Sequence, residues 1–449
     1  MILGVVVLEL KIGSTPFILL RDVLNDQIFT LNPEFVPEDG TGLNPLLQNY
    51  WMVIHPPTLF LGFAGTLVPF AFVIAGLWTR KYTEWIRPAL PWALGTGAVL
   101  GLGIMMGAYW AYETLNFGGY WNWDPVENAV YVPWLFLIAS IHTMLTARKS
   151  TTSLKTTIVL NITTFVLILY STFLTRSGIL GESSVHSFTD LGLSGQLLLY
   201  LLFFIAVSVI LGWRRWGSIP QTGNEINAYN REFWILAGSI VLCLMGFQVL
   251  LPTSIPVYNS IVELFGGVSN LAPPAEQVTF YSNIQIWFGI AVAIVSGMGQ
   301  FFWWTKMSKD NLYKELSNPL LITLVLSSLI IVVTGVEKIS YILLLTAGVY
   351  TIVANSFILF RVFKNNIKVT GGSIAHFGIG LILIGIMFSS GYSRIISSNI
   401  SGVQLSDGGS NEFESENIRL FIEDAVDMGD YELQYLGQRL TAKEVKGFF

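Results

Sequence analysis

Four histidines occur in the 449 residues of the chain, and they divide into two pairs. His142 and His376 lie inside segments apolar enough to cross a membrane, whereas His55 and His186 lie outside such segments. Ionisable side chains within membrane spans are rare and usually functional. Paired imidazoles, with no cysteine cluster and no carboxylate triad, fit the axial ligation of a haem iron better than zinc or non-haem iron. The alternative is that each buried histidine is a hydrogen-bonded packing residue.

A second candidate site is an aromatic stretch between two apolar segments, GGYWNWDPVENAVYVPW, which starts at Gly118. Trp121 and Trp123 offer flat apolar faces on which a porphyrin can stack. Gly118 and Gly119 allow the backbone to approach a large planar ligand closely. The alternative is an interfacial belt, because tryptophan and tyrosine are enriched at membrane surfaces in general. The two histidines outside the spans favour a haem platform.

Charged residues near these rings are few. Asp124 precedes Pro125 and is expected near the N-terminal cap of the following span. Arg176, the one basic residue in its connecting loop, is a candidate partner for a haem propionate, with a membrane-end anchor as an equal alternative. Cys243 lies in an apolar run and is expected to pack. The sequence assigns no role to three glutamates that are candidate polar lining groups: Glu113, Glu127 and Glu182.

The composition shows what must position these residues. The chain is 53% hydrophobic and only 12% charged, with a mean hydropathy of +0.60. Soluble domains carry roughly a quarter charged residues, so an all-α polytopic membrane protein is predicted. No basic patch indicates nucleic acid, and one cysteine allows no disulfide framework. Ten transmembrane helices are predicted, over residues 59–78, 89–110, 129–147, 156–175, 194–212, 233–251, 284–304, 318–335, 339–360 and 371–390.

Lysine and arginine are distributed unequally between the two sets of loops. One set carries fifteen of them, and the loops that join spans on the other side carry only Arg176 and Lys338. By the positive-inside rule, the first set faces the cytoplasm or the equivalent side of an organelle membrane. His55, His186 and the aromatic loop are then outside. His142 and His376 each lie about 8 Å inside the cytoplasmic end of a span.

Three regions are expected along the chain. The first, residues 1–58, holds a partial span and His55, and the last, residues 391–449, is a small outer β-rich domain that is expected to be incomplete. Alternating polar and apolar residues over 416–440 predict a β-hairpin with a turn near Gly429. Between these regions, residues 59–390 form the transmembrane domain, which includes the aromatic loop 111–128 and the outer loops 176–193 and 252–283.

Several motifs in one order give the chain a specific resemblance. GGYWNWDPVENAVYVPWL resembles the tryptophan-rich WWD signature of haem-handling proteins of cytochrome c maturation. Together with LNPLLQNYWMVIHPPTLFLGF, LTRSGILGESSVHSF and GGSIAHFGIGLILIG, it is similar to the CcmF family, the large membrane subunits of the cytochrome c haem lyase. The resemblance covers residues 40–440.

The resemblance implies a role for each matching position. His55 and His186 would ligate haem presented on the outer face, and His142 and His376 would hold a permanent haem b. The residues that match the WWD region are Trp121, Trp123 and Asp124, with Gly118, Gly119, Pro125, Glu127 and Asn128 around them. The implied reaction is the stereospecific joining of haem vinyl groups to the two thiols of a CxxCH apocytochrome c.

The resemblance also implies partners and a location. Haem would arrive on the chaperone CcmE, a CcmH-type subunit would present the apocytochrome, and the haem b would reduce the incoming haem, with quinol as a candidate reductant. The location would be the bacterial inner membrane with the WWD loop in the periplasm, or the mitochondrial inner membrane with this loop in the intermembrane space. Family members carry further N-terminal spans, so an N-terminally short or split form with a companion chain is expected.

Three alternatives stay open. One is a CcsA-type cytochrome c synthetase, which also has a WWD region, although VIHPP and the adjoining LNPLLQ favour CcmF. Another is a transporter of haem or a small molecule, which would place polar groups at mid-membrane in broken helices. A third is a b-type quinol oxidoreductase without lyase activity, for which the Trp121–Asp124 loop would be dispensable.

Overall fold

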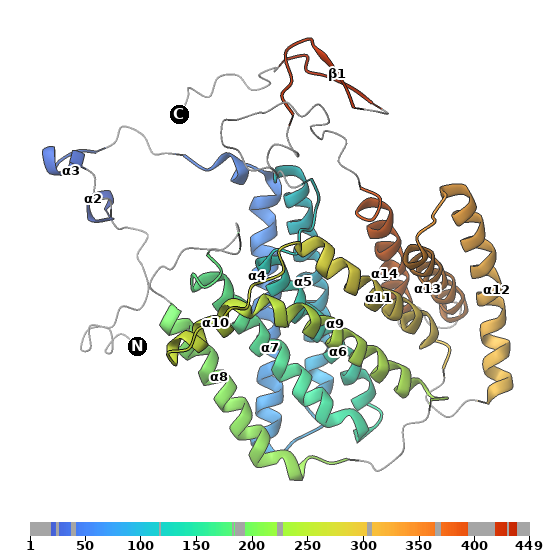
Figure 1. Cartoon of the computed structure of the whole chain (residues 1–449). Coiled ribbons are helices and arrows are strands. Elements are labelled where there is room, and N and C mark those ends of the chain that lie inside the picture. The colour runs from blue at the N-terminus through green and yellow to red at the C-terminus, as the bar shows by residue number, and fades with distance from the viewer. Residues whose placement is uncertain are drawn as a thin grey trace. The chain divides into compact units, whose positions relative to one another are not determined.

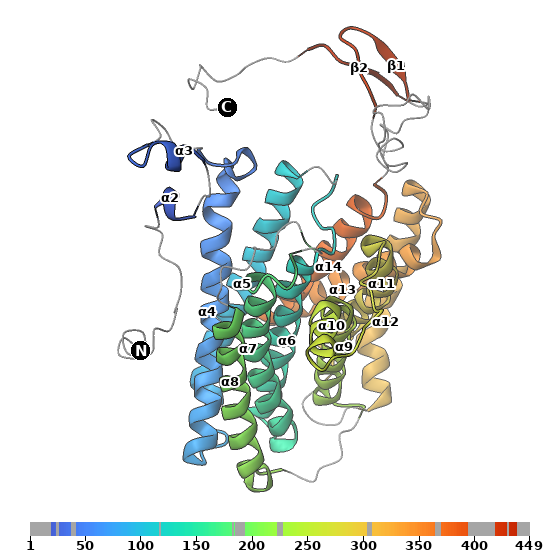
Figure 2. The ribbon, with the colours of Figure 1, turned by 60° about the vertical axis from the view of Figure 1, so that its left-hand side comes forward.

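The computed structural model describes residues 19–23, 27–36, 42–115, 118–181, 184, 194–221, 228–302, 308–363, 370–393, 418–428 and 431–437. Within these ranges, ten helices are long and apolar enough to cross a membrane (Figure 1, Figure 2). They are α4 (Tyr50–Thr79), α5 (Ile86–Thr114), α6 (Pro125–Ala147), α7 (Leu154–Arg176), α8 (Ser194–Arg215), α9 (Arg231–Thr253), α11 (Gln277–Met298), α12 (Lys309–Thr334), α13 (Ile339–Phe363) and α14 (Gly371–Ser389).

All ten predicted spans are confirmed, and most of the helices extend beyond them. The aromatic loop is shorter than predicted, because α5 continues to Thr114 and α6 begins at Pro125. The predicted outer loop 252–283 also contains the helix α10 (Ile255–Leu264). Shorter described elements are α2 (Leu20–Val23), α3 (Gln27–Leu31) and the 3-10 turns η1 (Pro45–Leu47), η2 (Thr151–Ser153) and η3 (Trp216–Ser218).

The chain divides into two compact units. The helical unit comprises residues 1–35 and 44–384, and the C-terminal unit comprises 36–43 and 385–449. In the C-terminal unit, β1 (Ala425–Asp427) pairs antiparallel with β2 (Glu432–Gln434), with Val426 opposite Leu433. The predicted antiparallel pairing is therefore confirmed, and the predicted turn at Gly429 lies outside the described residues.

Helix α6 is the most enclosed helix of the helical unit. In its most apolar membrane-length window 72% of the residues are buried, against 17% in the windows of α8 and α14. It packs mainly against α7 and α9, and Phe136 lies against Gly246 of α9. Lipid tails solvate apolar side chains about as well as a neighbouring helix does. Exposed leucines and valines on the outer helices therefore cost little free energy. The enclosure of α6 makes it a fixed support for whatever its side chains bind.

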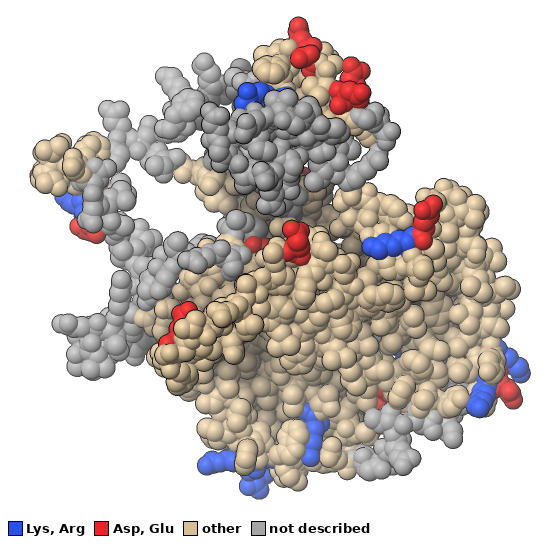
Figure 3. All heavy atoms as spheres, in the orientation of Figure 1, with Lys and Arg blue, Asp and Glu red and all other residues tan. Residues whose placement is uncertain are grey.

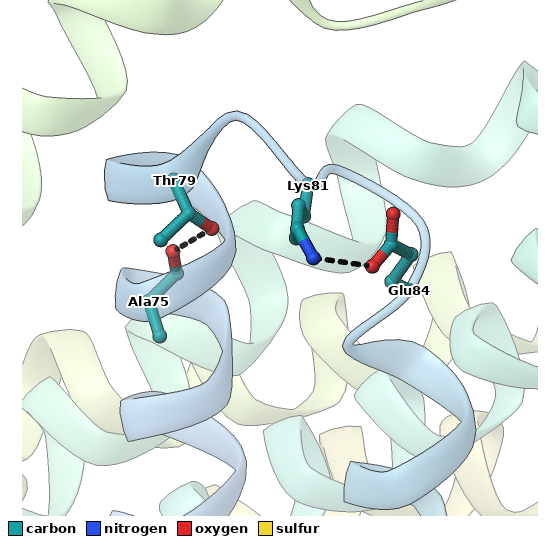
Figure 4. Close-up of polar contacts among 4 residues, drawn as sticks. All are labelled: Ala75, Thr79, Lys81 and Glu84. Carbon is teal, nitrogen blue, oxygen red and sulfur yellow. Dashed lines mark hydrogen bonds and ion pairs between the residues drawn. The ribbon is translucent and has the colours of Figure 1, made fainter.

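Close contacts at glycines set the packing of α4 on α5. A methyl group at Gly62 would stand 2.7 Å from the Cα of Leu100, and one at Gly103 would stand 2.9 Å from the Cα of Leu59. The helices join through a tight turn in which Arg80 has a left-handed φ of 60°. Next to it, the Lys81 ammonium lies 3.2 Å from the Glu84 carboxylate, and the Thr79 hydroxyl donates to the Ala75 carbonyl (Figure 4).

Glycines also set the packing of α14 on α13. A Cβ at Gly380 would lie 2.8 Å from Ile352, and a Cβ at Gly348 would lie 2.8 Å from Ile384. Gly380 is therefore a point of close helix–helix contact. Gly372, one turn before His376, lies against the side chain of Gln300 instead.

Charge is confined largely to the rims of the helical unit. Figure 3 shows a broad uncharged field over its helices, with most of the visible lysine and arginine side chains at the lower end of the view. The apolar surface and the lengths of the helices identify an integral membrane protein.

Candidate functional site

Two histidines from distant parts of the sequence meet inside the helical unit. The ring centres of His142 on α6 and His376 on α14 are 5.9 Å apart, and the ring planes are within 22° of parallel. Both side chains are half-buried. Metal–nitrogen bonds to imidazole are about 2 Å long, so two imidazoles on one metal ion place their ring centres about 6 Å apart. The observed spacing fits this arrangement.

The hydrogen bonds of the pair define which ring nitrogens can bind a ligand. The His142 Nδ1 lies 2.7 Å from the carbonyl oxygen of Ile138, one turn earlier on α6. A carbonyl only accepts, so Nδ1 carries the proton and Nε2 presents its lone pair. The His376 Nδ1 lies 2.9 Å from the side-chain nitrogen of Gln300. Among the described residues, no group of three or more His, Cys, Asp and Glu side chains could hold a metal ion.

His55 lies within helix α4, which starts earlier than the span predicted from residue 59. Helix α4 begins at Tyr50, where the Asn49 side chain accepts from the Trp51 amide, and it continues through Pro56 and Pro57. Each proline removes a helical hydrogen bond. Helix α4 nevertheless packs along α5 here and remains one continuous helix.

The His55 ring is held against α5 by two contacts. Its Nδ1 donates to the carbonyl of Gly103 at 2.7 Å, and a Cβ at Gly107 would stand 2.6 Å from its Cε1. A backbone carbonyl is again the partner of Nδ1, so the ring holds the tautomer with a lone pair on Nε2. Within the described residues, the hydrogen bonds and ring contacts of His55 do not reach the aromatic loop.

The aromatic loop is built around a backbone position that is unusual for tryptophan. Trp123 has φ 56°, a left-handed conformation that typically costs about 1–3 kcal/mol in a non-glycine residue. Its ring stacks on Tyr281 of α11 at 5.3 Å, and its indole N–H donates to the Ser282 hydroxyl at 3.0 Å. Trp121 meets Trp123 edge-on at 5.9 Å. Gly118, with φ 75°, supplies a second left-handed turn.

A buried polar layer supports this loop from the helices. The Asn128 side-chain nitrogen donates to the Trp123 carbonyl at 2.9 Å and to the Thr253 hydroxyl at 3.1 Å. The Tyr131 hydroxyl reaches Gln285 at 3.4 Å. Helices α6, α9 and α11 therefore all contribute to holding one strained tryptophan in place.

Asp124 and Glu127 form the N-terminal cap of α6. The Asp124 side chain accepts from the Val126 amide at 2.8 Å and from the Ser184 hydroxyl at 2.8 Å. Glu127 reaches back to the amides of Asn122 and Asp124, which completes a capping box. The expectation of Asp124 near the cap agrees with these contacts. Any further role of the Asp124 carboxylate has to be compatible with these hydrogen bonds.

The other predicted residues occupy several different elements. Gly119 lies in the aromatic loop, Arg176 is the half-buried last residue of α7, and Cys243 packs at the edge of a core cluster of α6, α7, α9 and α11. Glu113 accepts from Asn49 at 3.1 Å. His186 and Glu182 lie outside the described residues.

Sequence reasoning missed two groups of residues. Arg231 and Gln300 approach His376, and Tyr281 and Ser282 approach Trp123. Arg231 counted only as a loop cation, and Gln300 is a single polar residue in an apolar run. The sequence signal that could have identified Gln300 is a polar side chain within an apolar run.

Comparisons with known proteins agree with the motifs. A family model described as "Cytochrome C assembly protein" matches residues 12–181. The cytochrome c-type biogenesis protein CcmF of Escherichia coli (strain K12) is 32% identical over 82% of this chain and 57% of its own length. CcmF of Haemophilus influenzae is 37% identical over 62% of this chain and 43% of its own length.

A solved structure of a cytochrome c haem lyase CcmF has the same fold. It superimposes with a TM-score of 0.60 at 24% identity and covers 86% of this chain and 58% of that chain. The chain spans about half the length of the curated relatives it matches. With ten transmembrane helices, the WWD motif and similarity over most of its length, the chain closely resembles the CcmF family of cytochrome c assembly proteins.

Proposed function

We propose that this chain is the haem-lyase component of cytochrome c maturation, acting within a complex. It receives haem on the outer face and attaches the haem vinyl groups to the CxxCH thiols of apocytochrome c. The observation that carries the proposal is the approach of His142 and His376, with ring centres 5.9 Å apart between α6 and α14.

At the inner site, His142 and His376 are the proposed axial ligands of a resident haem b. When bound, this haem would supply one-electron reduction of the incoming haem, with quinol as a candidate electron source. The protein contributes the fixed tautomer of His142, through Ile138, and the orientation of both rings. Because His142 lies on the enclosed helix α6, the distance between the two rings depends chiefly on the position of α14.

At the outer site, His55 is one proposed ligand of the haem substrate and His186 is the other. Trp121 and Trp123 would stack on the macrocycle, and Arg176 would pair with a propionate. Because the Nδ1 of His55 is bonded to the Gly103 carbonyl, Nε2 is the nitrogen that could bind iron. Asp124 and Gly118 shape the loop that presents the rings, and Gly119 would let the backbone approach the macrocycle.

The chemistry requires little from the protein beyond orientation. Each thioether forms when a thiol adds to a vinyl group: the S–H bond breaks, an S–C bond forms, and the proton ends on the other vinyl carbon. The single Cys243 cannot supply two thiols, so both come from the apocytochrome. A CcmE-type chaperone would deliver haem, and a CcmH-type subunit would present the apocytochrome.

The charge asymmetry supports a location for each site. The lysine-rich and arginine-rich loops would face the cytoplasm, and the aromatic loop and the C-terminal unit the periplasm of a bacterial inner membrane. In a mitochondrion, the intermembrane space would replace the periplasm.

Haem content after ligand removal tests the inner site. The measurement is a pyridine haemochrome spectrum of detergent-purified wild type, His142→Ala and His376→Ala, expressed with ample haem. Wild type is expected to carry haem b and each variant to lose most of it. Ile374→Ala, an exposed position on α14, is the control and is expected to keep its haem. A wild type without haem b, or two variants that keep it fully, would overturn the assignment.

A further inference from the structure

A chain of hydrogen bonds joins a cation to one of the paired histidines. Arg231, the first residue of α9, donates through Nη2 to the side-chain oxygen of Gln300. Gln300 lies in the turn after α11, and its amide nitrogen is 2.9 Å from the Nδ1 of His376. All three side chains are half-buried, and each comes from a different element. In a half-buried site, the guanidinium acts through a lower dielectric than it would in water.

The guanidinium determines which way the amide of Gln300 faces. Arginine can only donate, so the single oxygen of the amide has to face Arg231 and its NH2 group faces His376. The His376 Nδ1 then accepts, and the ring proton is on Nε2. His142 is in the opposite tautomer, because its Nδ1 donates to Ile138. The two rings of the pair therefore carry their protons on different nitrogens, His142 on Nδ1 and His376 on Nε2.

Iron at the Nε2 of His376 would require a change in this arrangement. The proton would have to be on Nδ1, and Nδ1 would then need an acceptor. The amide oxygen of Gln300 can serve if the amide turns, since a carbonyl has two lone pairs and can accept from Arg231 and His376 together. The amide packs against the first turn of α14, where a Cβ at Gly372 would stand 3.4 Å from its nitrogen.

We propose that Gln300 and Arg231 are positioning residues that raise the reduction potential of the haem held by His142 and His376. This inference rests on the proposed function, because it assumes a haem at that pair. An outer-sphere acceptor sets how strongly a histidine donates to its metal. An oxygen already polarised by Arg231 is a weak acceptor for the Nδ1 proton, so His376 is a weak donor to iron. The nearby positive charge also favours the reduced iron, which carries one positive charge fewer.

The test is a redox titration of the haem in detergent-purified protein, followed by optical absorption. Gln300→Glu offers a stronger acceptor of similar shape, and Arg231→Met removes the cation. Each is expected to lower the midpoint potential by about a tenfold change in the equilibrium constant for reduction, which is about 59 mV for one electron. Lys149→Met, which removes an exposed cation between α6 and α7, is expected to leave the potential unchanged.

Haem content of each preparation separates the possible failures. If wild type contains no haem b, the assignment of the histidine pair fails. If Gln300→Glu contains haem b at the wild-type potential, the pair stands and the role of Gln300 and Arg231 is overturned. The near-isosteric Gln300→Glu decides the matter if Arg231→Met does not fold. The electron paramagnetic resonance g values of the oxidised haem should shift in Gln300→Glu as well, since they report on the axial imidazole.

Discussion

At the scale of single residues, both described histidine sites use backbone carbonyls to fix a tautomer. His55 bonds to Gly103 on a neighbouring helix, and His142 bonds to Ile138 on its own helix. His376 differs, because its partner is a side chain that can turn. The absence of a side chain at Gly107 matters as well, because the His55 ring fills that space.

Replacing Gly107 by alanine should displace His55. The new methyl group would stand 2.6 Å from Cε1 and 3.0 Å from Nε2 of the ring. Overpacking typically costs about 1–3 kcal/mol, which corresponds to about a 5- to 150-fold loss of affinity. Haem staining of mature c-type cytochrome should fall in Gly107→Ala, while the haem b content stays unchanged. Gly95→Ala on the same helix, where a Cβ meets no described atom within 4 Å, should mature cytochrome normally. Equal staining in both variants would argue against His55 as a ligand.

At the scale of elements, α6 connects the two candidate sites. Its first turn is capped by Asp124 and Glu127 below the aromatic loop, and its last turns carry His142. The loop and the inner histidine are therefore fixed to one enclosed helix. Loss of the cap would loosen the start of α6 and the loop together.

Substitutions at Asp124 can separate a capping role from a direct chemical one. Asp124→Ala should lower stability by about 0.5–2 kcal/mol, since the cap acceptor is lost. Asp124→Asn keeps an acceptor and should stay close to wild type in thermal unfolding in detergent. If Asp124→Asn also matures cytochrome normally, the carboxylate acts only as a cap. A stable Asp124→Asn protein without activity would instead show that the negative charge is needed.

The sequence predicts the helices of this protein better than their contacts. Hydropathy alone identifies all ten spans, because a membrane helix must be apolar along its length. Helix α4 begins at Tyr50, before the predicted residue 59, because its first turns pack against α5 and such packing is not a local signal. Arg231 and Gln300 could not be predicted, since their approach to His376 depends on how α9, α11 and α14 assemble. By contrast, His142 and His376 could be predicted as site residues directly, because ionisable side chains are rare within membrane spans.

At the scale of the whole molecule, the charge asymmetry of the loops predicts the orientation in the membrane. Cys243 is the only cysteine, so a Cys243→Ser background allows single cysteines to be placed at will. Val268→Cys, at an exposed position between α10 and α11, should react with a membrane-impermeant maleimide in intact cells. Lys149→Cys, between α6 and α7, should react only after the membrane is permeabilised. The reverse pattern would invert the proposed topology.

The length of α6 between its two sites has an electrical consequence. His142 lies 17 residues after Pro125, so the aromatic loop and the inner histidine pair are about 26 Å apart along the helix axis. This is most of the roughly 30 Å hydrocarbon thickness. An electron that passes from a haem at the inner pair to a haem at the loop would therefore move through much of the transmembrane field. A full crossing of 100 mV changes its energy by about 2.3 kcal/mol. With the cell interior negative, the field drives the electron outward, and an energised membrane would assist reduction of the incoming haem.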